Sequence, residues 1–140
     1  MANPGAATTS TFNAVVSPYP LQLLFFLPNA NMQLSNQDQQ FTRIFTGSLY
    51  DPIYIIALWK SGAASGSPTG GIYPLPSRGG TGLVSSTQSY SGLTGANTQV
   101  NVTIQATTTT YSQTPFLNVN AANAAALFAD FRIYGFCYDI

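Results

Sequence analysis

The sequence predicts an all-β fold, a β-sandwich for which the jelly roll is one fitting topology, with at most one short helix. Short segments rich in aliphatic, aromatic and β-branched residues alternate with clusters of Gly, Pro, Ser and Asn along the 140 residues. This pattern is typical of sandwiches and barrels. The length corresponds to one domain. We place that domain at residues 12–140, after an N-terminal arm at residues 1–11 that we expect to be flexible or bound to a partner.

The first half of the chain predicts three strands. Residues 21–27 are a continuous apolar run between two prolines, which suits a strand buried on both faces. The amide-rich residues 29–38 predict a loop, and strands are expected at 40–46 and 53–60. Residues 61–71, SGAASGSPTGG, predict an exposed mobile loop.

The second half predicts further strands. Residues 72–75 should form an edge strand or an extended segment, because Pro at 74 and 76 cannot donate to a sheet. Strands are also expected at 83–90, 107–111 and 115–120. The last strand, 131–138, has aromatic residues on its second face, which indicates a central position in the sandwich or a place in an interface.

Two segments have a clear periodicity or composition. Residues 99–105 alternate strictly, so Val100, Val102 and Ile104 should face the core and the amides and hydroxyls should face water or a partner. Residues 121–128 are rich in alanine and are the helix candidate, although the segment is short and also fits a turn.

Charged side chains make up 6% of the chain, against about 25% in a typical soluble domain. The sequence contains neither histidine nor glutamate, so the usual general base near neutral pH and the commonest metal ligand are missing. Serine triads, Cys-His dyads and histidine-based metal sites are therefore excluded. We predict a structural or binding protein that is not an enzyme, with no catalytic, cofactor-binding or metal-binding residues.

The four carboxylates are the remaining candidates for acid–base chemistry: Asp38, Asp51, Asp130 and Asp139. Two of them could converge as a glycosidase pair. We favour turn and strand-end roles, because Asp51 precedes a proline and Asp130 opens the last strand. The aspartates are too widely spaced along the chain to predict a calcium loop.

Three other features have a chemical and a structural interpretation. Lys60 precedes Ser61, but no Ser-x-x-Lys spacing exists, so we expect the lysine to solvate a strand end. The glycine-rich segment 79–82 lacks the Lys-Ser/Thr of a phosphate loop and predicts a turn. Cys137, the single cysteine, is expected to be a small core residue.

The charge balance also bears on partners. The formal net charge is zero and the four basic residues are scattered, so neither nucleic acid nor a membrane is expected as a partner. No apolar run reaches the length of a membrane span, and the N-terminus does not resemble a signal peptide. Near-zero charge favours self-association, and the eight tyrosines favour a large protein contact. A homo-oligomer is therefore expected.

The C-terminal half contains short Gly-, Ser- and Ala-rich motifs in a fixed order. The series is GGIY (70–73), SRGGT (77–81), QSY (88–90), LT (93–94), FLNV (116–119), an alanine-rich stretch (121–126) and ADFRIYG (129–135). In this spacing the chain resembles a group of small proteins encoded near tailed-phage capsid genes. The resemblance implies a virion component, a decoration or cement protein outside the capsid, and it carries over no catalytic residues.

We therefore predict a structural protein, made in the host cytoplasm, that binds neighbouring major capsid subunits on the exterior of the virion. One alternative is a receptor- or carbohydrate-binding module of a tail fibre or adhesin, with Trp59 and exposed tyrosines as stacking platforms. Another is a donor-strand filament subunit that would use residues 1–11 to complete a neighbour's sheet.

Overall fold

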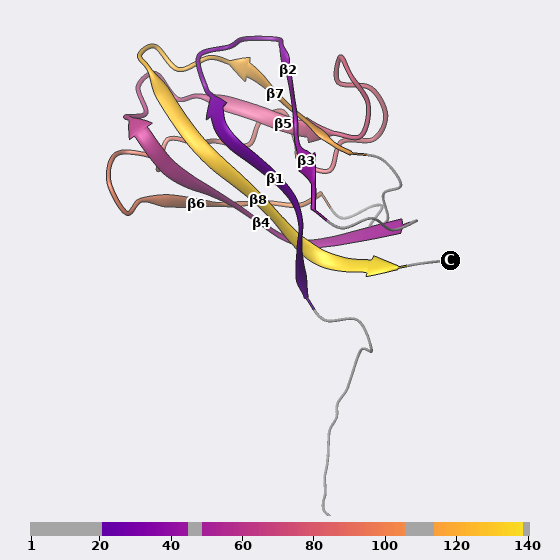
Figure 1. Cartoon of the computed structure of the whole chain (residues 1–140). Helices are drawn as coiled ribbons and strands as arrows, with labels where there is room; N and C mark the ends of the chain where they lie inside the picture. The colour runs from indigo at the N-terminus through magenta and orange to yellow at the C-terminus, as the bar shows by residue number, and fades with distance from the viewer. Residues whose placement is uncertain (1–20, 45–48, 106–113, 139–140) are drawn as a thin grey trace, which may run out of the picture.

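The computed structural model describes residues 21–44, 49–105 and 114–138, which form eight strands in two antiparallel sheets (Figure 1). This confirms the all-β prediction; the jelly-roll topology stays a prediction. The described residues form no helix, and hence none that is long and apolar enough to cross a membrane. The predicted arm at 1–11, the predicted strand at 107–111 and Asp139 lie outside the described residues.

The larger sheet has five strands in the order β3-β1-β8-β4-β6. Its members are β1 (Gln22–Asn31), β3 (Thr42–Arg43), β4 (Leu49–Gly62), β6 (Gln99–Val102) and β8 (Leu127–Tyr138). Figure 1 shows the long, curved β8 running between β1 and β4. Of the two alternatives predicted for the last strand, a central position or a place in an interface, the central position is confirmed.

The smaller sheet has three strands in the order β2-β7-β5. They are β2 (Asp38–Gln40), β7 (Phe116–Ala121) and β5 (Thr69–Tyr73). Because β5 lies at the end of this order, the edge-strand prediction for this part of the chain is confirmed. The proline at 74 follows the strand directly, where no ladder hydrogen bond is needed.

One hydrophobic core joins the inner faces of the two sheets. Phe131 of β8 lies at its centre, fully buried, with ring centroids 5.4 Å from Tyr90 and 6.3 Å from Phe41 in edge-to-face arrangements. Val102 is buried there, and Val100 and Ile104 pack against the same core as their alternation predicts.

Of the two structures that the sequence allows for residues 121–128, a short helix and a turn, the structure has the turn. β7 ends at Ala121, β8 begins at Leu127, and the residues between them form a turn. Asn123 explains the turn, since its buried side-chain amide donates to the carbonyls of Ala63 (3.0 Å) and Ala125 (2.7 Å). Such local side-chain bonds compete with helix formation, and a segment this short gains little from helix propensity alone.

The strand expected at 83–90 is also wrong, because the segment makes only isolated bridges to β5. Its hydroxyls form turns instead. The backbone N–H of Thr87 donates to the Ser85 hydroxyl at 3.2 Å, and the N–H of Gln88 donates to the Ser85 carbonyl at 3.1 Å.

Several boundaries in the first half differ from prediction. β1 continues through Pro28 to Asn31, into the expected loop, because a bulge between Leu27 and Ala30 accommodates the proline. The strand expected at 40–46 divides at Phe41, which is buried in the core while β2 and β3 belong to different sheets.

The polar segments are also more ordered than expected. The loop expected at 61–71 is shorter than predicted, because β4 extends to Gly62 and β5 begins at Thr69. Gly70 and Gly71 are buried. Asp51 and Pro52, expected in a turn, lie within β4 opposite Phe136 and Gly135. Cys137 packs against the core but is partly exposed.

Tyr90 gives the fold a predictable response to alkaline pH. Burial, with a smaller contribution from Tyr73, raises the pKa of Tyr90 far above its ordinary value of about 10. The folded protein therefore keeps the proton that the unfolded chain loses, so this contribution to stability is complete below about pH 10 and is lost as the pH rises further.

Tyr90→Phe should accordingly reduce the alkaline slope of the free energy of unfolding by about 1.4 kcal/mol per pH unit above about pH 10. Near neutral pH the variant should lose about 1 kcal/mol, because the Tyr90 hydroxyl donates to the carbonyl of Gly70 at 3.0 Å. Urea unfolding from pH 7 to 11.5 measures both effects. An unchanged alkaline slope in the variant contradicts the assignment to Tyr90.

Candidate protein-contact surface

The side of the five-stranded sheet that points away from the core is largely apolar. We call it the outer face, and it consists of Leu23, Phe26, Tyr54, Ile56, Leu58, Arg132 and Tyr134. Strand register brings these side chains together across three strands, since Tyr134 of β8 lies between Leu23 of β1 and Tyr54 of β4. Their neighbours along the chain, such as Ile55 and Phe131, point into the core.

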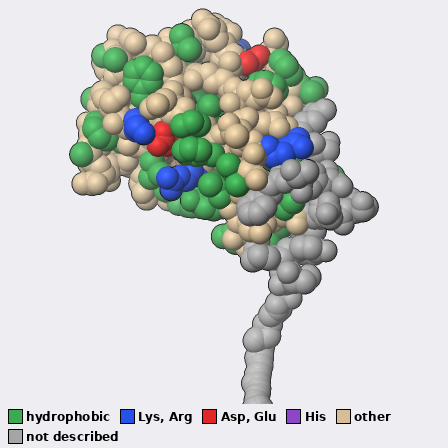
Figure 2. Space-filling view, viewed as in Figure 1, with side chains coloured by type: hydrophobic (Ala, Val, Ile, Leu, Met, Phe, Trp, Pro, Cys, Tyr) green, Lys and Arg blue, Asp and Glu red, His purple; other side chains and the backbone are tan. Residues whose placement is uncertain are grey.

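The outer face is partly accessible and slightly hollowed: most of its side chains are half-buried, and Ile56 is 8% exposed. Tyr54 is 40% exposed and the adjoining Leu21 is 55% exposed. A shallow groove of about 330 Å³ runs over the sheet here, lined by Leu21, Tyr54, Ile56, Leu58, Arg132 and Tyr134. Figure 2 shows hydrophobic side chains gathered on this side of the molecule, with a few basic side chains beside them. A contiguous apolar patch of this kind is typical of an interaction site.

The large side chains of the outer face are held in place by their neighbours. The rings of Tyr54 and Tyr134 lie 6.0 Å apart, and the Tyr54 hydroxyl donates to Oδ1 of Asn101 on β6 at 3.1 Å. The Arg132 guanidinium lies 5.7 Å from the centre of the Phe26 ring, a cation–π contact. Because these groups are already ordered, a partner that binds them loses less conformational entropy.

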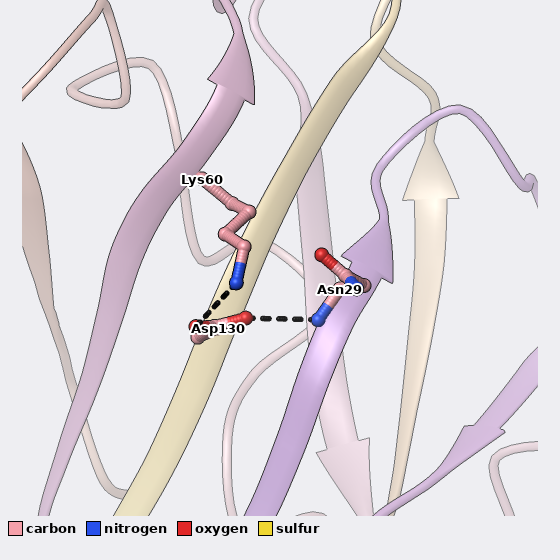
Figure 3. Close-up of polar contacts among 3 residues, drawn as sticks. All are labelled: Asn29, Lys60 and Asp130. Carbon is pink, nitrogen blue, oxygen red and sulfur yellow. Dashed lines mark hydrogen bonds and ion pairs between the residues drawn. The ribbon is translucent and has the colours of Figure 1, made fainter.

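A charged cluster borders the outer face (Figure 3). Lys60 Nζ lies 3.6 Å from Oδ2 of Asp130, and Oδ1 of Asp130 accepts a 2.9 Å hydrogen bond from the backbone N–H of Asn29. The cluster thus connects β4, β8 and β1. Lys60 neutralises a carboxylate within the sheet, where the sequence predicts only solvation of a strand end. Because Lys60 is half-exposed, the pair contributes at most about 1 kcal/mol to stability.

Among the described residues, the structure does not bring the candidate carboxylates Asp38, Asp51 and Asp130 together. Along β4, Asp51 pairs with Phe136, whereas Asp130 pairs with Leu58, seven residues further on. That separation is roughly 20 Å at about 3.3 Å per residue, too long for a glycosidase pair. Asp38 lies in the other sheet. No group of three or more potential metal-ligating side chains occurs within 21–44, 49–105 and 114–138.

The other candidates also have definite places. The glycine-rich segment begins in a tight turn, as predicted, with the N–H of Gly79 donating to the carbonyl of Pro76 at 3.0 Å. Trp59 packs partly against the core, and its Nε1 donates to the carbonyl of Gly62 at 2.7 Å. Beside it lies a groove of about 430 Å³ lined by Leu58, Trp59 and residues 96–99.

The tyrosines divide between the core and the surface. Tyr50 and Tyr90 are fully buried, whereas the exposed Tyr54 and the half-buried Tyr134 form a cross-strand pair on the outer face. These four tyrosines are therefore core residues or cross-strand partners.

Comparison of the chain with protein-family models, with curated proteins and with solved structures found no match. The functional proposal therefore rests on this chain's own residues.

Proposed function

We propose that the protein is a structural virion component that decorates or cements a capsid by lying against neighbouring major capsid subunits through its outer face. The observation that supports this most is the ordered apolar surface formed by Phe26, Tyr54, Ile56, Leu58 and Tyr134. A sheet face that ends in water normally carries polar side chains. Here the same positions carry the residue types that form the centres of protein interfaces.

The physical properties of the chain agree with a cementing role. A cement protein stabilises its partner by binding only the assembled form, so it needs contact area and no reactive groups. Apolar and tyrosine side chains supply that area without the cost of desolvating many ions. With zero formal net charge, copies of the chain do not repel one another on a crowded shell, which also supports a small homo-oligomer.

The proposal is tested on purified particles of the virus that encodes the protein. Quantitative mass spectrometry should find it in intact particles at a fixed ratio to the major capsid protein, and crosslinking should join Lys60, beside the outer face, to that protein. Particles from which the gene is deleted should open at a lower temperature. Absence of the protein from washed, intact particles contradicts the proposal.

The groove beside Trp59 supports glycan binding as a second candidate function. Its indole N–H is already bonded to Gly62, so the ring offers an apolar surface on which a sugar can stack. The side-chain amides of Asn97 and Gln99 line the same groove and make no hydrogen bond with other described residues. A glycan array probed with the protein should then give binding that Asn97→Ala removes; an array without any bound glycan contradicts this function.

A further inference from the structure

Arg78, at the tip of the turn after β5, is held rigidly by two amides from distant parts of the chain. Its Nε–H donates to Oδ1 of Asn118 at 2.9 Å, and Nη2 donates to Oδ1 of Asn36. Asn118 is 3% exposed and belongs to β7, so the guanidinium is fixed from within the smaller sheet. Arg78 itself is exposed.

Asn118 also orders a carboxylate without letting it reach the arginine. Its Nδ2 donates to Oδ1 of Asp38 at 3.0 Å, and the other oxygen of Asp38 accepts from the backbone N–H of Ser77 at 2.8 Å. The acidic and basic side chains are thus separated by an amide. The ion pair that the described residues contain joins Lys60 and Asp130 and does not involve Arg78.

The backbone at this site adopts an uncommon conformation. Ser77, Arg78 and Asn36 have φ values of 56°, 60° and 59°, in the left-handed region. Asparagine tolerates this region, but two consecutive residues of other types with side chains rarely occupy it. Backbone strain of this kind is concentrated at binding sites, where the surrounding structure maintains it.

The two amide bonds leave a defined set of donors on Arg78. A guanidinium has five N–H groups, and the bonds to Asn118 and Asn36 occupy the edge formed by Nε and Nη2. The edge formed by Nη1 and Nη2 still has a parallel pair of N–H groups, the geometry that binds a carboxylate through both oxygens. Arg78 also lines a pocket of about 250 Å³, together with Asn36, Ser77 and Asn118.

We propose that this pocket, the Arg78 site, is a preformed receptor for a carboxylate on a partner protein, an Asp or Glu side chain or a chain terminus. The amides orient the guanidinium and take up its other edge, so a carboxylate binds with little loss of side-chain entropy. Asn118 is a positioning residue in this arrangement. The site lies on the smaller sheet and depends on neither the outer face nor the capsid assignment.

The protein offers two internal controls for this inference. The Arg43 guanidinium lies over the Tyr50 ring at 5.4 Å, and that of Arg132 lies over the Phe26 ring at 5.7 Å. Both are cationic, but no pair of amides from the described part of the chain orients them. A general effect of salt should therefore change the signals of all three arginines, whereas carboxylate binding at the Arg78 site should change the signal of Arg78 alone.

The test is an NMR titration of the full, ¹⁵N-labelled protein with sodium acetate at constant ionic strength, following the arginine Nε–H signals. The Arg78 signal should shift and saturate at an acetate concentration at least about fivefold below that of any change at Arg43 or Arg132. Asn118→Ala should weaken this response several-fold while the Arg43 and Arg132 signals stay unchanged. Arg78→Lys should abolish the acetate response read from the backbone N–H of Ser77.

Two results overturn the proposal. In one, all three arginines of the wild-type protein respond to acetate in parallel, which makes Arg78 an ordinary surface charge. In the other, inorganic phosphate saturates Arg78 and acetate does not, which makes the pocket a phosphate site. Because the titration uses no capsid, its outcome is independent of the test of the proposed function.

Discussion

Replacing Gly135 with alanine should destabilise the protein by about 3 kcal/mol or more, a large effect for a single methyl group. A Cβ atom at this position would lie 2.0 Å from the Asp51 carbonyl oxygen and 2.9 Å from the Leu24 side chain. The first of these is backbone of β4, which cannot move aside without breaking its pairing with β8. Because β8 pairs with both β1 and β4, the strain acts on the whole larger sheet.

Gly95→Ala is the matched control. A Cβ atom there meets nothing within 4 Å, and the backbone is not in the left-handed region. The control should therefore be neutral or stabilised by up to about 1 kcal/mol, since alanine restricts the unfolded chain. Urea unfolding of the two variants beside the wild type measures the difference. Equal stabilities for Gly135→Ala and Gly95→Ala would show that the close approach of β8 to β4 is wrong.

The double variant Tyr54→Ser, Tyr134→Ser should weaken binding to capsids by about 100-fold or more, because tyrosines at the centre of an interface often contribute 2 kcal/mol each. Their rings form a cross-strand pair at the middle of the outer face, where Tyr54 is exposed and Tyr134 half-buried. Stability should change little, because neither ring enters the core. Co-sedimentation with capsids that lack the wild-type protein measures the affinity.

Leu75→Ser provides the control for this experiment. Leu75 is an apolar side chain that is 41% exposed, about as exposed as Tyr54. It lies just after β5 of the smaller sheet and therefore outside the outer face. The control should bind capsids as the wild type does. If it loses binding and the tyrosine double variant retains it, the contact surface lies on the opposite sheet.

Local patterns predicted much of the fold. The strict alternation at 99–105 and the alternation of the last strand follow directly from the two-residue period of a strand. The composition of the alanine-rich segment favours a helix, but the structure has a turn there. Asn123 holds that turn through hydrogen bonds with Ala63 and Ser65, which are distant in the sequence and could not be predicted locally. Phe41 divides a predicted strand for a similar reason, since its burial depends on the second sheet.

The outer face was harder to predict. Residues 54–58 of β4 are apolar at the positions that face one side of the sheet and at those that face the other. The sequence therefore indicates burial on both sides, as it does for 21–27. Only the packing shows that the smaller sheet covers one side. The Arg78 site had no local signal, because Arg78 is 42 residues from Asn36 and 40 residues from Asn118 along the chain. These residues meet only because β7 pairs with both β2 and β5.

The decisive measurement for the proposed contact is electron cryo-microscopy of the intact particle. We expect density for this protein on the outside of the shell, with the outer face of β1, β8 and β4 against the major capsid protein and Tyr54 and Tyr134 buried between them. A particle in which the protein is bound with this face toward solvent, or in which the shell contains none of it, would rule out the proposed function.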